Sequence, residues 1–121
     1  MNKKQKAFHL FITIVMLIVT ILLLCGCDEK TEYICEYEVQ STDKPMYIDY
    51  INDKGKQISI EVNELKWNYI FKAKTGDILS VKCFNTETAN LMSTIFVNNK
   101  PVAFKIVSSN EPDIELMYIL P

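Results

Sequence analysis

The feature that most constrains the fold is an alternation of apolar and polar side chains with a period of two, which dominates the chain from residue 32 onward. In the first such stretch the apolar members are Tyr33, Cys35, Tyr37 and Val39, and in a later one they are Ile58, Ile60 and Val62. Successive side chains of a β-strand point to opposite faces, so this period indicates half-buried strands. The chain after residue 32 is therefore predicted to be built from strands.

Turn signals divide this part of the chain into short segments. Strands are expected near residues 33–40, 46–51, 58–62, 66–72, 78–84, 92–97, 102–107 and 114–120. Gly55 can supply positive φ to a hairpin turn after the second strand, and Asn98 and Asn99 tolerate the left-handed conformation in a later one. Pro101 opens the return strand, where its missing N–H is tolerated. Residues 87–92 could form one helical turn, too short for a longer helix.

Short strands, tight turns and no amphipathic helix of useful length predict an all-β domain. The favoured architecture is a small Ig-like or Greek-key β-sandwich of seven to eight antiparallel strands, and a small barrel is the alternative. The pattern does not determine the order of the strands.

The first 26 residues differ from the rest of the chain. Lys3, Lys4 and Lys6 precede an uncharged apolar run from Leu10 to Leu24, which ends at Gly26 and Cys27. Positive charge, then an apolar stretch, then a small residue is the order found in secretory signals. An uncleaved transmembrane anchor is the alternative. In both cases the lysines stay on the cytoplasmic side and the C-terminal part is exported.

The tetrapeptide Leu24-Cys25-Gly26-Cys27 resembles the lipobox of bacterial lipoproteins. This resemblance implies cleavage before Cys27, acylation of its thiol with fatty acids such as palmitate, and anchoring in the membrane of the cell envelope. The predicted organisation is a lipoprotein signal peptide at 1–26, a short tether at 27–31 and a β-sandwich domain at 32–121.

Composition excludes several classes of function for the exported part. The chain has 13 lysines and no arginine against 15 acidic residues, and removal of 1–26 leaves 10 lysines and a net charge of −5. Nucleic-acid binding is not expected, because phosphate contact relies on clustered basic side chains. The single histidine, His9, lies in the leader, so no histidine is left for a catalytic dyad or a metal site. We expect no catalytic residues, no metal and no cofactor.

Several side chains of the exported part are candidates for particular roles. Cys35 and Cys83 fall on the apolar faces of their strands in an oxidising compartment, which favours a disulfide over two buried free thiols. Trp67, Tyr69 and Phe71 share one face and are predicted to be core residues; a ligand platform is the alternative for Trp67. Tyr47 lies on an outward face and is a candidate for a partner surface, because tyrosine is enriched at interfaces. Cross-strand pairing within the sheet is the alternative for Tyr47.

From Tyr37 to about Val107 the chain resembles the MmpS-type family of small exported β-sandwich proteins. The matching pieces are YIDYINDKGKQ, LKWNYIFKAKTGDILSV and IFVNNKPV, in which Trp67 opens a strand. The resemblance implies a non-enzymatic accessory role for RND-type membrane transporters. Tyr33-Ile34-Cys35 also resembles a segment of membrane-bound lysozyme inhibitors, which are compact β-barrels.

These observations predict a lipid-anchored, non-enzymatic module of the envelope that contacts the membrane through its lipid and an envelope protein through its domain. The alternative is a ligand-binding or lysozyme-inhibitor-like surface lipoprotein. An enzyme is the least favoured class.

Overall fold

The computed structural model describes residues 3–26 and 30–121, which form two separate units. The first unit contains one helix, α1 (Lys3–Gly26), and the second runs from Thr31 to Pro121. None of the helices in the described ranges combines the length and the hydropathy needed to cross a bilayer. The signal role of residues 1–26 stays a prediction, and Cys27 lies outside the described residues.

The second unit is all-β, as the period-two alternation predicts. Its described residues form eight strands: β1 (Glu32–Ser41), β2 (Met46–Ile51), β3 (Gln57–Val62), β4 (Lys66–Lys74), β5 (Ile78–Phe84), β6 (Thr88–Val97), β7 (Lys100–Asn110) and β8 (Asp113–Ile119). One expectation about the elements is wrong: residues 88–92 belong to β6, so the suggested helical turn does not form. Strand pairing with β7 outweighs the polar composition there.

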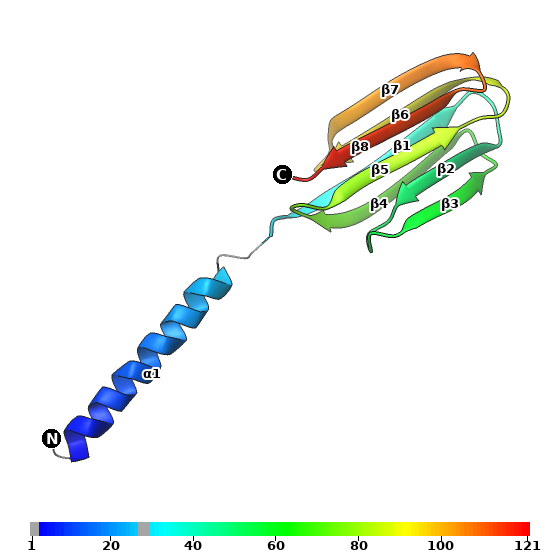
Figure 1. Ribbon diagram of the computed structural model, residues 1–121. Coiled ribbons are helices and arrows are strands. Elements are labelled where there is room, and N and C mark those ends of the chain that lie inside the picture. The colour runs from blue at the N-terminus through cyan, green and yellow to red at the C-terminus, as the bar shows by residue number, and fades with distance from the viewer. Residues whose placement is uncertain (1–2, 27–29) are drawn as a thin grey trace. The chain divides into compact units, whose positions relative to one another are not determined.

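The strands form two four-stranded sheets that are stacked as a sandwich (Figure 1). We call the sheet with the order β4-β1-β6-β7 sheet A and the one with the order β3-β2-β5-β8 sheet B. All neighbouring strands are antiparallel. Only β2–β3 and β6–β7 are hairpins within one sheet, and every other connection crosses between the sheets.

The core lies between the sheets and is made of the inward members of the alternation. In β1 the buried side chains are Cys35, Tyr37 and Val39, while the residues between them are partly exposed. Sheet B contributes Ile48 from β2 and Val81 from β5, neither of which has solvent contact. All residues of the buried cluster lie within Thr31–Pro121, so the sandwich has a core of its own.

The turns gather at two opposite ends of the sandwich. We call the end at which the chain enters β1 the entry end and the opposite one the far end. At the entry end lie Thr31, the turns at 52–56, 75–77 and 98–99, and Leu120. At the far end lie the turns at 42–45, 63–65, 85–87 and 111–112. At the entry end Gly55 has φ 74° and Asn98 and Asn99 have φ 49° and 65°, which confirms the predicted left-handed turns. Gly76, with φ 89°, adds a further one.

Two hydrogen bonds between the sheets indicate how β1 is aligned against β5. Ser80 N donates to Tyr37 Oη (3.1 Å), and Asn85 Nδ2 donates to Ser41 Oγ (3.3 Å). The members of these two pairs are 43 and 44 residues apart in the sequence. The near-constant separation means that β1 and β5 run in the same direction across the sandwich.

This alignment shows that the predicted disulfide is wrong. Cys35 and Cys83 are both buried and both free. They are 48 residues apart, four or five more than the aligned pairs, which displaces them by roughly 13–17 Å along the strands. Disulfides rarely form when the Cα atoms are more than about 7 Å apart. Both cysteines point inward as expected, but Cys35 lies near the entry end and Cys83 near the far end.

Asn85 is a buried polar residue that the pattern did not single out. Its Nδ2 also donates to Asp43 O (3.0 Å), its Oδ1 accepts from Glu87 N (2.9 Å), and its backbone N donates to Pro112 O (3.0 Å). The Asn85 side chain, which is 2% exposed, therefore connects two turns of the far end, and its backbone N–H adds a third.

Candidate functional site

The two lateral sides of the sandwich differ, and the candidate site lies on the open one. Edge strands β7 and β8 pack against each other and close one side, whereas edge strands β3 and β4 make no comparable contact. Inward side chains of β3 and β4 near this opening, such as Ile60 and Trp67, are only half-buried. The opening exposes part of the core surface to solvent.

Aromatic side chains occupy this opening. The Tyr50 ring lies 5.1 Å from Trp67 and 4.9 Å from Tyr69 between ring centroids, and Tyr69 is 5.1 Å from Phe71. Phe71 is in the core, as predicted, while Trp67 and Tyr69 are half-buried and pack against it. Such rings offer large apolar faces at little cost in side-chain entropy, which suits them to binding.

A cavity of about 460 Å³ lies at the entry end of the same side. Its residues come from the β2–β3 turn, the end of β4 and the start of β5: Ile51, Asn52, Asp53, Lys54, Gly55, Phe71, Ala73, Gly76, Asp77, Ile78 and Leu79. Apolar side chains form its floor and charged ones its rim. Its size falls in the range of small-molecule sites, which combine apolar walls with a few polar groups.

Local hydrogen bonds hold both rim turns in place. Asn52 Oδ1 accepts from Lys54 N and Lys56 N at 2.9 Å each, and Asp77 Oδ2 accepts from Lys74 N at 2.9 Å. The Tyr69 hydroxyl donates to Asp53 Oδ1 over 3.4 Å, which connects the aromatic cluster with the rim. These hydrogen bonds thus fix the two turns that surround the opening of the cavity.

Burial lowers the reactivity of the two thiols of the sandwich, Cys35 toward the entry end and Cys83 near the far end. Burial raises the pKa of the Cys35 thiol to about 11, with a further contribution from the Asp77 carboxylate, and it raises the pKa of the Cys83 thiol to about 12. The thiolate is the nucleophilic form, so both cysteines are poorly reactive at neutral pH. Burial also raises the pKa of Tyr37 well above its usual value of 10.0.

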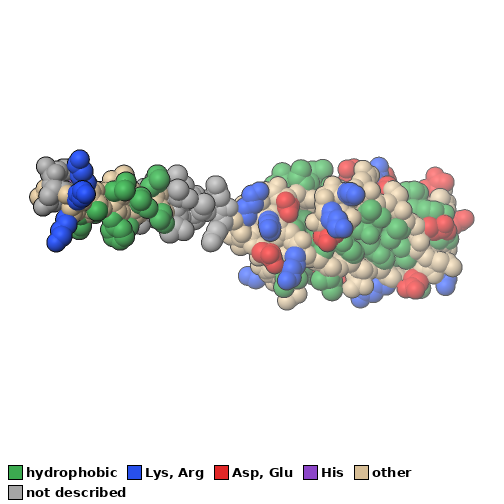
Figure 2. All heavy atoms as spheres, turned by 90° about the horizontal axis from the view of Figure 1, so that it is seen from below, with side chains coloured by type: hydrophobic (Ala, Val, Ile, Leu, Met, Phe, Trp, Pro, Cys, Tyr) green, Lys and Arg blue, Asp and Glu red, His purple; other side chains and the backbone are tan. Residues whose placement is uncertain are grey.

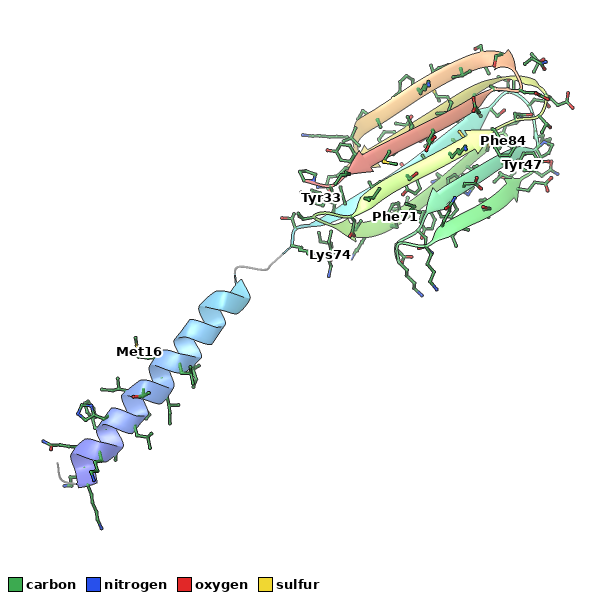
Figure 3. All side chains as sticks on the ribbon, viewed as in Figure 1. Met16, Tyr33, Tyr47, Phe71, Lys74 and Phe84 are labelled. Carbon is green, nitrogen blue, oxygen red and sulfur yellow. The ribbon has the colours of Figure 1, made fainter. Side chains whose placement is uncertain are left out.

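Tyr47, the predicted partner residue, lies away from this site. It is on the outer face of sheet B toward the far end, half-buried, and its ring stacks on Phe84 at 5.0 Å (Figure 3). The structure thus does not bring Tyr47 together with Trp67, Tyr69 and Phe71. Phe84 was not singled out in the sequence, although its place opposite Tyr47 follows from the β2–β5 pairing.

A second apolar surface lies on the outer face of sheet A. Phe104 and Ile106 of β7 are more than half exposed, and Ile106 borders a hollow of about 380 Å³ together with Leu65 and Met92. Within the described residues no three His, Cys, Asp or Glu side chains are grouped to hold a metal ion.

No protein-family model matches this chain, and no curated protein shows significant similarity to it. The assignment of function consequently depends on the sequence of residues 1–27 and on the geometry of the sandwich.

Proposed function

We propose that the protein is a lipid-anchored, non-enzymatic lipoprotein of the bacterial cell envelope whose sandwich serves as an interaction module. In this proposal residues 1–26 are the signal peptide, Cys27 carries the lipid, and the domain belongs to the Ig-like Greek-key class. An accessory role for a membrane complex, as in MmpS-type proteins, is the specific form that the resemblance suggests.

The observation that carries the proposal is the position of the cavity relative to the candidate anchor. The cavity opens at the entry end, and β1 begins at Glu32, only five residues after Cys27. The four intervening residues span at most about 14 Å when fully extended. A partner group that enters the cavity would therefore be held close to the membrane surface.

Anchoring also strengthens a weak contact. A domain tethered to the membrane meets other envelope proteins at a high effective concentration, so that a modest intrinsic affinity is enough for occupancy. The half-buried rings of Tyr50, Trp67 and Tyr69 supply the contact surface.

Lipidation is tested by replacing Cys27 with Ala and labelling cells with a palmitate analogue. The variant should remain a longer, unlabelled precursor, because the acyl acceptor and the processing site are lost. Cys25→Ala is the matched control, since it removes a neighbouring thiol and should still be labelled and processed. Equal labelling of the Cys27→Ala variant and the parent protein would rule out this anchor.

The module role requires a second experiment. The domain is exported without Cys27 at equal abundance, and proteins that crosslink to it in intact cells are compared with those of the anchored form. An envelope partner should crosslink mainly to the anchored form. Equal crosslinking by both forms would remove the reason for a membrane-side partner.

A second candidate function is the binding of a soluble ligand or a lysozyme-like enzyme, and the cavity of about 460 Å³ is the observation that favours it. In that case the purified protein inhibits muralytic activity or binds a small apolar ligand with the same affinity whether anchored or not. Ala73→Phe, which places a ring at the cavity floor, should abolish such binding, whereas Ser109→Phe on β7 should not.

A further inference from the structure

Charged side chains are distributed unequally between the two ends of the sandwich. The entry end, counted from Lys30, has six lysines and three acidic residues: Lys30, Lys54, Lys56, Lys72, Lys74, Lys100, Glu32, Asp53 and Asp77. The far end has two lysines and six acidic residues: Lys44, Lys66, Asp43, Glu61, Glu64, Glu87, Glu111 and Asp113. From Lys30 onward the chain has 10 lysines and 13 acidic residues, yet its entry end has an excess of lysines; the acidic Asp28 and Glu29 precede Lys30 in the sequence.

The lysines of the entry end are available for contact. All six are exposed. Of these six lysines, only Lys72 has a carboxylate of the described residues within salt-bridge distance, that of Glu32 at 3.6 Å. On the face that Figure 2 displays, basic side chains predominate at this end of the sandwich, with acidic ones among them, and acidic side chains predominate at the other end.

Exposed isoleucines accompany these lysines. Ile34 lies beside Lys72 in the β1–β4 ladder, and Ile78 lies beside Ile119 in the β5–β8 ladder. Their exposed fractions are 55%, 47% and 60%, respectively. Exposed apolar side chains and lysines at the same end of a domain are typical of surfaces that rest in the interfacial region of a membrane. There the apolar side chains enter the headgroup region and the lysines bind lipid phosphates.

We propose that the entry end docks directly on an anionic lipid surface. The inference rests on the proposed anchor at Cys27, and two observations select lipid as the occupant. The charge of this end is opposite to that of an anionic leaflet. Residues 28–31 span at most about 14 Å, which lets the lysines come within the Debye length of about 8–10 Å over which that charge acts. The acidic far end is repelled by the same surface, so the domain stands with its far end outward.

Amine footprinting of the full-length lipidated protein tests this orientation. The protein is reconstituted in vesicles of phosphatidylcholine alone or with one third phosphatidylglycerol, treated briefly with an acetylating reagent, and analysed by mass spectrometry. Lys54, Lys56 and Lys100 should be acetylated at least threefold more slowly in the anionic vesicles. Lys44 and Lys105 of the same molecules should be acetylated equally in both, and 1 M salt should remove the difference.

Two variants that lose the same number of positive charges distinguish an effect of the entry end from one of overall charge. In one, Lys54, Lys56 and Lys100 are replaced by Gln, and in the matched control Lys44, Lys82 and Lys105 are replaced by Gln. Protection of the remaining Lys74 by anionic lipid should be lost in the first variant and kept in the second. Equal loss in both variants would overturn the proposal, because only overall charge would then matter.

The remaining outcomes separate this inference from the anchor. Protein that floats with the vesicles but is acetylated equally in both lipids keeps its anchor and refutes the docking. Protein that does not float with either vesicle refutes the anchor, and the docking with it. Protection in native membranes but not in lipid vesicles would also refute lipid docking and would assign the entry end to a protein partner.

Discussion

Removing the hydroxyl of Tyr37 is a direct test of how the two sheets are held together. This side chain has no solvent exposure, and its hydroxyl donates to Ile51 O (2.8 Å) while accepting from Ser80 N (3.1 Å). It thus connects β1 of sheet A with β2 and β5 of sheet B. Tyr37→Phe keeps the ring and its packing on Phe71 at 4.9 Å, and removes only these two bonds.

The expected loss of stability follows from the two bonds. A buried hydrogen bond contributes about 0.5–1.5 kcal/mol net, and a buried donor left without a partner costs about 1–3 kcal/mol. We therefore expect Tyr37→Phe to lower the free energy of unfolding by roughly 2–3 kcal/mol. A domain of this size has a total stability of about 5–13 kcal/mol. The corresponding fall in melting temperature is roughly 8–20 °C.

Urea denaturation followed by Trp67 fluorescence, together with a thermal melt, measures this loss. Tyr33→Phe is the matched control, since Tyr33 lies on the same strand and face but its hydroxyl bonds to Pro121 O (2.8 Å) in an exposed setting. Its effect should stay within about 0.5 kcal/mol. If the two variants are equally stable, the reasoning from the buried hydroxyl is refuted.

Further predictions concern the far end and the thiols. Asn85→Ala should destabilise the domain by roughly 2–4 kcal/mol in urea denaturation, because the groups in two turns that bond to its side chain lose their hydrogen-bond partner. An effect below about 1 kcal/mol would contradict this role. Cys35 and Cys83 should resist alkylation in the native domain and react fully in urea, and the untreated mass should be that of two thiols; a mass two hydrogens lower would show a disulfide after all. Because burial raises the pKa of Cys83 from 9.0 to about 12, the unfolded thiol ionises first as the pH rises. Stability should therefore fall between pH 9 and 12, and Cys83→Ala should show a shallower fall in melting temperature over that range; identical slopes would refute the burial argument.

The strands and their inward faces could be predicted from the sequence, since burial against one layer imposes a period of two on each strand. The hairpin at Asn98 and Asn99 was also predictable, because the residues that tolerate positive φ are few. Which strands lie beside one another in each sheet could not be predicted. Alternation determines which side chains face inward but carries no information on which strand lies beside another, and β1 pairs with strands more than 25 residues away.

The same limit explains the errors at the candidate site. Because Cys35 and Cys83 both face inward, the sequence suggested a disulfide between them. Their separation along the strands depends on how the two sheets are aligned, which the alternation does not determine. Trp67 faces inward as expected, yet β4 is an edge strand on the open side, so the ring is only half-buried. The cavity is formed by two turns that follow different strands, and no local pattern in the sequence brings them together.

The position of β1 in the middle of sheet A has a mechanical consequence. β1 is the strand through which the chain enters the domain, and it is hydrogen-bonded along its length to β4 on one side and β6 on the other. Tension between a membrane anchor and the far end acts along this strand. Hydrogen bonds of an antiparallel ladder lie perpendicular to the strands, so such a pull loads many of them in shear at once instead of opening them one by one. With the proposed anchor at Cys27, a force applied through the anchor would therefore be resisted by both ladders of β1 together.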